Sequence, residues 1–440
     1  MRKFLGARQK LYYGWIMLFS LSVTETVSWG ILYYTFTVFI QPMQKELGWS
    51  RGELTVAFSL ALLLSGLAGV PVGRWLDGHG TRALMTTGSV LATLLVLAWS
   101  RVNSLPLFYL TWMGIGLTMA AVLYDPAFVV VATWFRRRRG RALTVLTFVA
   151  GFASVIFIPL AEWLVQLQGW RGALQTLAVI LGLITIPLHS LVLRRKPADL
   201  GLLPDGFIPA AESAQNDRTV TKTSSTSSET IPEESYSLRE ALHSPAFWWL
   251  TVSFTLNTLG QVAVMVHLVP YLTDHGYSSG FAASMAGLIG LLALPGRLVF
   301  NLLAEHLPRT FLTALIFLLQ SLSLVVLLTF QNVTGVFVFV ALFGAGFGAI
   351  TPLRAGLVVG LFGPSYYGRI NSVMGLLVTT ARGLGPVGVG VAFDITGSYP
   401  PLFWLLALIS LAAALTITRL PKPPAPANVE EPASKAGQMD

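Results

Sequence analysis

The chain has 440 residues, of which 54% are hydrophobic and only 11% are charged. This composition excludes a soluble globular protein, and the absence of cysteine excludes disulfides, a thiolate nucleophile and cysteine-ligated metal sites. The net charge of +9 could indicate a nucleic-acid-binding protein, but the basic residues are distributed as in a membrane protein.

Apolar runs of about 18 residues or more recur along the whole chain, and each is long enough to cross a bilayer as a helix. They predict an all-α integral membrane protein with twelve transmembrane helices. The predicted spans are residues 13–40, 53–76, 83–100, 105–134, 142–166, 173–193, 246–272, 279–304, 310–330, 334–361, 369–393 and 400–418.

Basic residues gather at alternate ends of these spans, on the side that holds both termini. Because cytoplasmic loops carry an excess of Lys and Arg, we predict a multi-pass protein of the cell membrane with both termini in the cytoplasm and no nucleic-acid partner. The N-terminal apolar run is too long for a signal peptide, so it is interpreted as an uncleaved first span. The basic residues are Arg2, Lys3, Arg8, Lys10, Arg82, Arg141, Arg194, Arg195, Lys196, Arg309, Arg369, Arg419, Lys422 and the run 136–139.

A polar stretch rich in Ser, Thr and Lys interrupts the apolar pattern in the middle of the chain. It lacks the apolar surface needed to fold alone, so it predicts a flexible cytoplasmic linker with a short interfacial helix at 235–242. The predicted organisation is an N-terminal six-helix bundle at 1–196, a linker at 197–245, a C-terminal six-helix bundle at 246–420 and a disordered cytoplasmic tail at 421–440.

The two apolar halves resemble each other at a fixed offset. Pro42 recurs as Pro270, 228 residues later, and each further match falls at the end of an apolar segment. Two facing repeats of about six spans are typical of secondary transporters with a site at the membrane midplane. The further matches are Gly48 with Gly276, Trp49 with Tyr277, Ser50 with Ser278, Asp77 with Glu305, Gly140 with Gly368, Arg141 with Arg369, and Gly169 with Gly397.

The loop between the second and third spans reads Gly-Arg-Trp-Leu-Asp-Gly-His-Gly-Thr-Arg at 73–82. It resembles the Gly-x-x-x-Asp-x-x-Gly-x-Arg loop of the major facilitator superfamily, and a degenerate copy lies at 301–310. In this loop an acid caps a helix N-terminus and an arginine pairs with charge at the cytoplasmic face. Asp77 and Arg82 are therefore predicted to take part in gating.

Three further segments resemble one branch of that superfamily, the bacterial monocarboxylate and oxalate/formate transporter-like proteins. They are Tyr-Tyr-Gly-Trp at 12–15, Glu-Leu-Gly-Trp-Ser-Arg at 46–51 and Trp-Phe-Arg-Arg-Arg-Arg-Gly-Arg-Ala at 134–142. The resemblance implies two six-helix bundles around a central cavity that opens alternately to either side. It also implies anion recognition by Arg297 and Arg382. Oxalate carriers have Lys in the eleventh span, so Arg382 argues against oxalate itself while keeping the positive charge.

The charged residues predicted at membrane depth are Glu25, Asp125, Arg297, Arg354 and Arg382. Each costs about 2.5–3.5 kcal/mol to insert unless it is paired or hydrated, so such residues normally face a cavity. Two carboxylates against three guanidinium groups leave one positive charge without a partner. A substrate carboxylate would complete this set, because a guanidinium binds a carboxylate through two parallel hydrogen bonds.

These residues suggest specific roles. We predict Arg382 as the main substrate anchor and Arg297 as the second, with structural pairing to acids or backbone carbonyls as the alternative for both. Glu25 or Asp125 is predicted to couple protons to transport, with a fixed ion pair as the alternative.

Weaker candidates complete the predicted site. Asp125 and Arg354 are predicted to close the inner side as a gate pair, or each pairs elsewhere. Asn257, Gln261 and Tyr33 are candidate substrate contacts, with helix packing and interface anchoring as their alternatives.

The sequence thus predicts a secondary active transporter of small organic anions, above all monocarboxylates, that works by alternating access with protons or a counter-anion. It is predicted to act as a monomer in contact with lipid and without a cofactor. A carrier of zwitterions or amphipathic drugs, and a sensor built on a carrier fold, remain alternatives. An enzyme is disfavoured because the chain shows no metal-ligand spacing, nucleophile–base set or nucleotide loop.

Overall fold

The computed structural model describes residues 12–135, 138–206, 236–304, 306–363 and 366–421, and this part of the chain is helical apart from short connections. The N-terminal half contains α1 (Tyr13–Trp29), α2 (Phe36–Leu47), α3 (Arg51–His79), α4 (Thr81–Trp99), α5 (Leu105–Val122), α6 (Tyr124–Trp134), α7 (Arg139–Ala150) and α8 (Ala153–Pro187). The C-terminal half contains α9 (Leu238–His243), α10 (Pro245–Asp274), α11 (Ser279–Leu303), α12 (Arg309–Thr329), α13 (Val333–Phe347), α14 (Ile350–Phe362), α15 (Tyr367–Thr396) and α16 (Pro400–Thr418).

Within the described residues, eleven helical stretches are long and apolar enough to cross a membrane. One of them, Arg139–Val192, has 54 residues. At about 1.5 Å per residue it is more than twice as long as a bilayer core of about 30 Å is thick. Gly169 interrupts it with a φ of +70°, a conformation that glycine adopts without steric cost. This stretch is therefore long enough to cross twice, which gives the described residues the twelve crossings predicted from the sequence.

Four of the spans predicted as continuous are interrupted near their middle. The first contains a π-helical turn at Gly30–Tyr34. The fourth breaks at Leu123, where Pro126 cannot donate the helical hydrogen bond to Val122. The fifth and tenth break between α7 and α8 and between α13 and α14. Interrupted spans leave backbone groups free of the helical ladder, and in carriers such breaks lie at the binding site.

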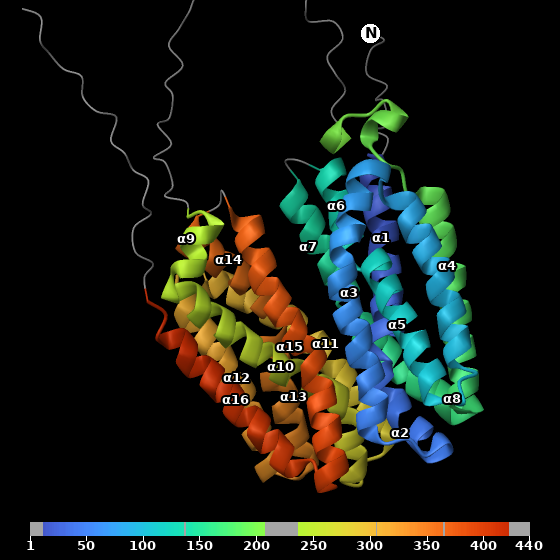
Figure 1. Ribbon diagram of the computed structural model, residues 1–440, viewed down its shortest axis with the longest axis vertical. Helices are drawn as coiled ribbons and strands as arrows, with labels where there is room; N and C mark the ends of the chain where they lie inside the picture. Colours follow the sequence, from blue (N-terminus) through green and yellow to red (C-terminus); the bar gives the residue numbers. More distant parts are fainter. Residues whose placement is uncertain (1–11, 136–137, 207–235, 305, 364–365, 422–440) are drawn as a thin grey trace, which may run out of the picture.

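The two halves stand side by side and converge at one end of the molecule (Figure 1). We call this the far end; the opposite terminal end holds Tyr12, the first described residue. The halves meet where α3 packs on α15 and α8 packs on α11. The α3–α15 contact runs from Gly52 against Val391 to Gly66 against Thr379.

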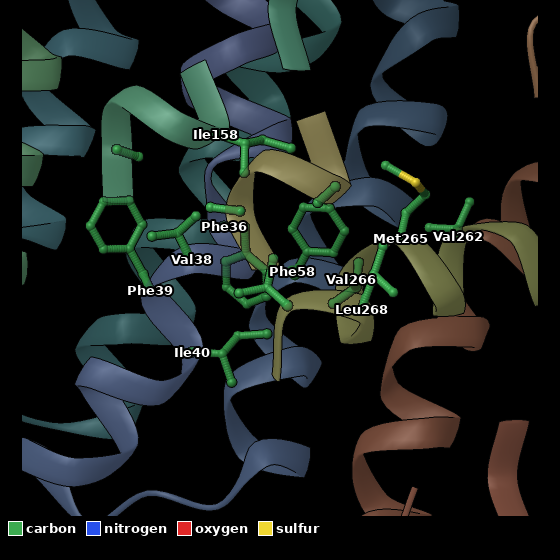
Figure 2. Packing of buried hydrophobic residues seen from close by; sticks show 14 of the residues in the cluster. Phe36, Val38, Phe39, Ile40, Phe58, Ile158, Val262, Met265, Val266 and Leu268 are labelled. Atoms are coloured by element: carbon green, nitrogen blue, oxygen red, sulfur yellow. The ribbon is translucent and has the colours of Figure 1, made fainter. Parts of the chain in front are cut away.

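Buried apolar side chains from both halves seal the far-end half of this contact. Figure 2 shows Phe36 and Phe58 of the N-terminal half in one cluster with Val262 and Val266 of the C-terminal half. The Thr37 hydroxyl donates a 2.8 Å hydrogen bond to the Val266 carbonyl oxygen, which places α2 directly against α10.

The predicted linker and tail are only partly described. Residues 197–206 form two short 3₁₀ turns, and α9 matches the short helix predicted at 235–242. Residues 207–235 and 422–440 lie outside the described residues.

Candidate functional site

Glu25 is a fully buried carboxylate on α1, with 0% of its surface exposed. Its Oε2 accepts a 3.1 Å hydrogen bond from Nε1 of Trp29, one helical turn further along. Its Oε1 has no hydrogen-bond partner among the described residues. A half-satisfied carboxylate in this environment is costly unless it binds a proton or a ligand.

An aromatic cluster of Trp29, Tyr33, Tyr34 and Tyr124 lies beside Glu25. The ring centroid of Trp29 is 5.3 Å from that of Tyr33 and 5.1 Å from that of Tyr124. The rings of Tyr33 and Tyr34 are 5.0 Å apart. The π-helical turn produces this arrangement, because its wider register lets both consecutive tyrosines lie against Trp29.

Arg382 of α15 approaches this cluster from the other half of the molecule. It interacts electrostatically with Tyr33, Tyr34 and Asp125. Its guanidinium forms no hydrogen bond or salt bridge within the described residues. Arg382 is half-buried at the interface between the halves, and the nearby Asp125 carboxylate does not form a salt bridge with it in the described part of the chain.

Arg297 of α11 lies near the same aromatic side chains, with electrostatic interactions to Tyr34 and Tyr124. Its Nε donates a 3.0 Å hydrogen bond to the carbonyl oxygen of Gly348, in the break between α13 and α14. One nitrogen of Arg297 is thus bound to a backbone carbonyl, as the alternative to a substrate-binding role expects. It also fixes the guanidinium with its charge toward the N-terminal half.

Two amide side chains extend the polar lining along α10. Asn257 is completely buried, and neither its Oδ1 nor its Nδ2 has a partner among the described residues; Gln261 Nε2, one turn away, also lacks one. A buried amide group without a partner costs about 1–3 kcal/mol, so these atoms are positioned for water or a ligand. Helix α10 packs closely on α15 here, because the Cβ position of Gly385 would clash with the carbonyl oxygen of Leu259.

The structure therefore brings Glu25, Asp125 and Tyr33 of the N-terminal half together with Arg382 and Arg297 of the C-terminal half. Neither carboxylate forms a salt bridge to an arginine: the salt bridges of the described residues are Arg51 with Asp274 and Arg171 with Glu46.

The predicted gating contacts stay predictions. Asp125 is exposed and interacts with Arg382, so the Asp125–Arg354 pair stays a prediction. Arg82 was expected to pair with charge, but its Nε donates a 2.8 Å hydrogen bond to the carbonyl oxygen of Ser190. The side chain of Asp77 lies outside the described residues.

The sequence reasoning missed a polar contact between the halves at the far end. Arg51 is only 5% exposed, and its Nη1 and Nη2 lie 2.6 and 2.9 Å from the two carboxylate oxygens of Asp274. Asp394 accepts hydrogen bonds of 3.1 and 2.8 Å from the backbone N–H groups of Arg51 and Gly52, at the N-terminus of α3. We call Arg51, Asp274 and Asp394 the far-end latch.

Aromatic rings of the C-terminal half hold the Arg51 guanidinium in this latch. The guanidinium carbon lies 4.2 Å from the ring centroid of Phe393 and 5.2 Å from that of Tyr399. A useful sequence signal existed, because Arg51 ends the Glu-Leu-Gly-Trp-Ser-Arg segment noted above. Asp274 and Asp394 lie near the ends of α10 and α15, and only the fold brings them to Arg51.

Comparison with known proteins identifies the architecture. The family model described as Major Facilitator Superfamily matches residues 18–386 and 308–438. The chain belongs to the Major Facilitator Superfamily. It is accordingly a multi-pass membrane transporter of the secondary type and not an enzyme, and it acts on a small-molecule substrate.

Relatives within the superfamily include Monocarboxylate transporter 13 of Bos taurus, which is 26% identical over 421 residues, covering 93% of this chain and 89% of the relative. The Oxalate:formate antiporter of Oxalobacter formigenes is 22% identical, covering 88% and 87%. These matches confirm the predicted resemblance to the monocarboxylate and oxalate/formate branch.

Solved structures confirm the fold. A bacterial homologue of the human lysosomal transporter Spinster, in an inward-facing and unoccupied conformation, superposes with a TM-score of 0.64 at 15% identity, covering 94% of this chain and 95% of the other.

Proposed function

We propose that this major facilitator protein carries small monocarboxylates across the cell membrane. The observation that carries the proposal is Arg382, a guanidinium at the interface between the halves that forms no salt bridge with any of the described residues. A guanidinium binds one carboxylate through two parallel hydrogen bonds, and the neighbouring Tyr33 and Tyr34 rings offer a small amphipathic wall for a short carbon chain. The similarity to monocarboxylate transporters supports the same substrate class.

The buried carboxylate of Glu25 favours proton coupling. It accepts one hydrogen bond from Trp29 and forms no salt bridge within the described residues, so its ionised form is poorly stabilised. A proton bound at Glu25 or Asp125 together with a substrate anion at Arg382 neutralises the site. A neutral site crosses between the two open states at lower electrostatic cost than a charged one.

The conformation supports alternating access. The described hydrogen bonds that join the two halves lie at the far end or between the far end and the middle of the spans. They come from Thr37, Gln41, Arg51, Gly52 and Gln166. We assign the terminal end to the cytoplasm from its basic residues, which makes this an inward-open state. The predicted inner gate of Asp125 and Arg354 would close in the opposite state.

The test is uptake of labelled lactate and acetate by the purified protein in liposomes, with and without an inward proton gradient. Accumulation should follow the gradient in the parent protein and fall to background in Arg382→Ala. Arg382→Lys should keep part of this accumulation, because lysine retains the positive charge but cannot form two parallel hydrogen bonds to a carboxylate. The matched control is Arg309→Ala, because Arg309 is exposed and bonds the carbonyl oxygen of Gly356 within its own half. Normal lactate and acetate uptake in Arg382→Ala would refute the proposal.

A zwitterion is the second candidate, and a specific arrangement favours it. Glu25 and Asp125 approach the site from one half while Arg382 and Arg297 approach from the other, so an amino acid could bridge the two. Competition separates the candidates: alanine at millimolar concentration should leave lactate uptake unchanged if the carrier is selective for monocarboxylates.

A further inference from the structure

A cavity of the N-terminal half is lined by none of the residues of the proposed substrate site. It has a volume of about 650 Å³ and lies at the terminal end, between the beginning of α4 and the end of the sixth span. Figure 1 places α4 on the side of the molecule that faces away from the C-terminal half. The transport cycle proposed above makes no use of this cavity.

The lining of the cavity is strongly basic. Among the described residues, the lining contains Arg82, Arg194, Arg195 and His79 together with one carboxylate, Asp199. Arg82 is held by the bond from its Nε to Ser190, and Arg194 by bonds of 2.8 and 3.0 Å from its Nη1 to the carbonyl oxygens of Leu191 and Leu193.

These bonds orient two guanidinium groups with neutral acceptors and leave their charge unpaired, since neither arginine belongs to a salt bridge of the described chain. Thr86 also lines the cavity, and its buried Oγ1 has no hydrogen-bond partner in the described residues. A tetrahedral anion with several acceptor oxygens, such as a phosphate ester, would satisfy this donor set.

The cavity continues into an aliphatic surface. Leu91 and Leu94 of α4 are 53% and 56% exposed, and Leu183 of α8 is 72% exposed. The two helices are in contact beside these residues, because the Cβ position of Gly182 would lie 3.0 Å from the side chain of Thr93. Exposed leucines on neighbouring helices form a track that leads from the basic cavity toward the middle of the membrane.

An aromatic pair marks the depth of the cavity. His79 lines it and stacks on Trp75, with ring centroids 4.3 Å apart, while 44% of Trp75 is exposed. Exposed tryptophans of membrane proteins concentrate at the level of the lipid headgroups. The basic groups are therefore at the depth at which a phospholipid carries its phosphate, and the leucine track is at the depth of its chains.

We propose that this cavity is a binding site for an anionic phospholipid. Arg82 and Arg194 bind the phosphodiester, Thr86 donates to it, and the acyl chains lie along Leu91, Leu94 and Leu183. A basic pocket between spans beside an exposed aliphatic track fits a lipid better than a soluble phosphate, which would leave the track without a function.

The experiment uses the full-length protein in detergent, titrated with phosphatidylglycerol or phosphatidylcholine, and counts bound lipids by native mass spectrometry. The test variant is the triple substitution Arg82→Gln, Arg194→Gln and Arg195→Gln. The control is Arg141→Gln, Arg239→Gln and Arg419→Gln, three exposed arginines at the terminal end with the same total charge change. A second variant, Ala83→Trp, fills the cavity without removing charge, so the test stands even if the triple variant does not fold.

The parent protein should retain phosphatidylglycerol in preference to phosphatidylcholine. Each basic residue near an anionic lipid surface contributes several-fold in affinity, so the triple variant should bind phosphatidylglycerol at least about tenfold more weakly. The control should bind like the parent, and Ala83→Trp should lose the tightest-bound lipid. Equal losses in both triple variants, or unchanged binding in Ala83→Trp, would overturn the proposal. Competition by glycerol 3-phosphate at equal concentration would also overturn it, by assigning the cavity to a soluble phosphate.

Discussion

The far-end latch makes a quantitative prediction about the balance between the two open states of the carrier. Asp274→Asn removes the charge opposite Arg51 while keeping the size and one acceptor oxygen of the side chain. The side chain of Arg51 is 7% exposed and that of Asp274 is 29% exposed. Removing one partner of a fully buried pair costs about 3–5 kcal/mol.

The expected cost here is lower, at about 2 kcal/mol, because Asp274 is partly hydrated and Asn keeps one acceptor. The latch joins the two halves only while the far end is closed. Its loss therefore destabilises this state relative to the opposite one, and about 2 kcal/mol corresponds to roughly a 30-fold shift in their ratio.

Spin-label distances measure this shift directly, and the chain has no cysteine to remove beforehand. One label pair, Arg101→Cys with Gln331→Cys, spans the halves at the far end, and another, Arg141→Cys with Arg239→Cys, spans them at the terminal end; all four positions are exposed. Asp274→Asn should add a longer distance at the far end and a shorter one at the terminal end.

The matched control is Glu46→Gln. It breaks the 2.8 Å pair with Arg171, which lies at the same end but within one half, so it should leave both distance distributions unchanged. Unchanged distances in Asp274→Asn, or equal shifts in both variants, would refute the reasoning that the latch holds the far end closed.

Three further predictions follow from the same structure. Glu25→Gln should abolish accumulation driven by a proton gradient while keeping exchange of labelled for unlabelled lactate in liposomes, and retained gradient-driven accumulation would contradict the coupling role of Glu25. Gly290→Leu should disfavour the present conformation, because even a Cβ at this position of α11 would clash with the Ser154 hydroxyl of α8. The far-end label pair reports the change, and unaltered distances would count against this prediction. Ser50→Ala should lower the free energy of unfolding by about 1 kcal/mol, because Ser50 and Glu53 form a reciprocal cap at the start of α3. The control is Ser104→Ala, at an N-cap without a side-chain hydrogen bond, which should have no effect. Thermal unfolding in detergent measures both variants.

Much of this protein follows from the sequence because the bilayer simplifies the problem. A run of about 20 apolar residues can satisfy its backbone in lipid only as a helix, so the spans could be predicted one by one from local composition. The costs of burying charge likewise identified Glu25, Asp125, Arg297 and Arg382 as residues that need a cavity or a partner. The structure brings these four together.

Other features depend on contacts between distant segments. The breaks at Gly30–Tyr34 and Leu123 decide which side chains meet, and they place Tyr34 and Tyr124 beside Trp29. The local sequence around Tyr34 or Tyr124 does not distinguish it from a tyrosine that anchors a helix at the membrane interface.

The far-end latch shows the same limit most clearly. Asp274 and Asp394 are 223 and 343 residues from Arg51 in the chain, so nothing in their neighbourhoods predicts the contact. The sequence by itself determined the number of spans, their helical form and the charges that require a site. Only the tertiary structure decided which charges face one another, because the electrostatic energy of a buried group depends on what lies within a few ångströms in space rather than along the chain.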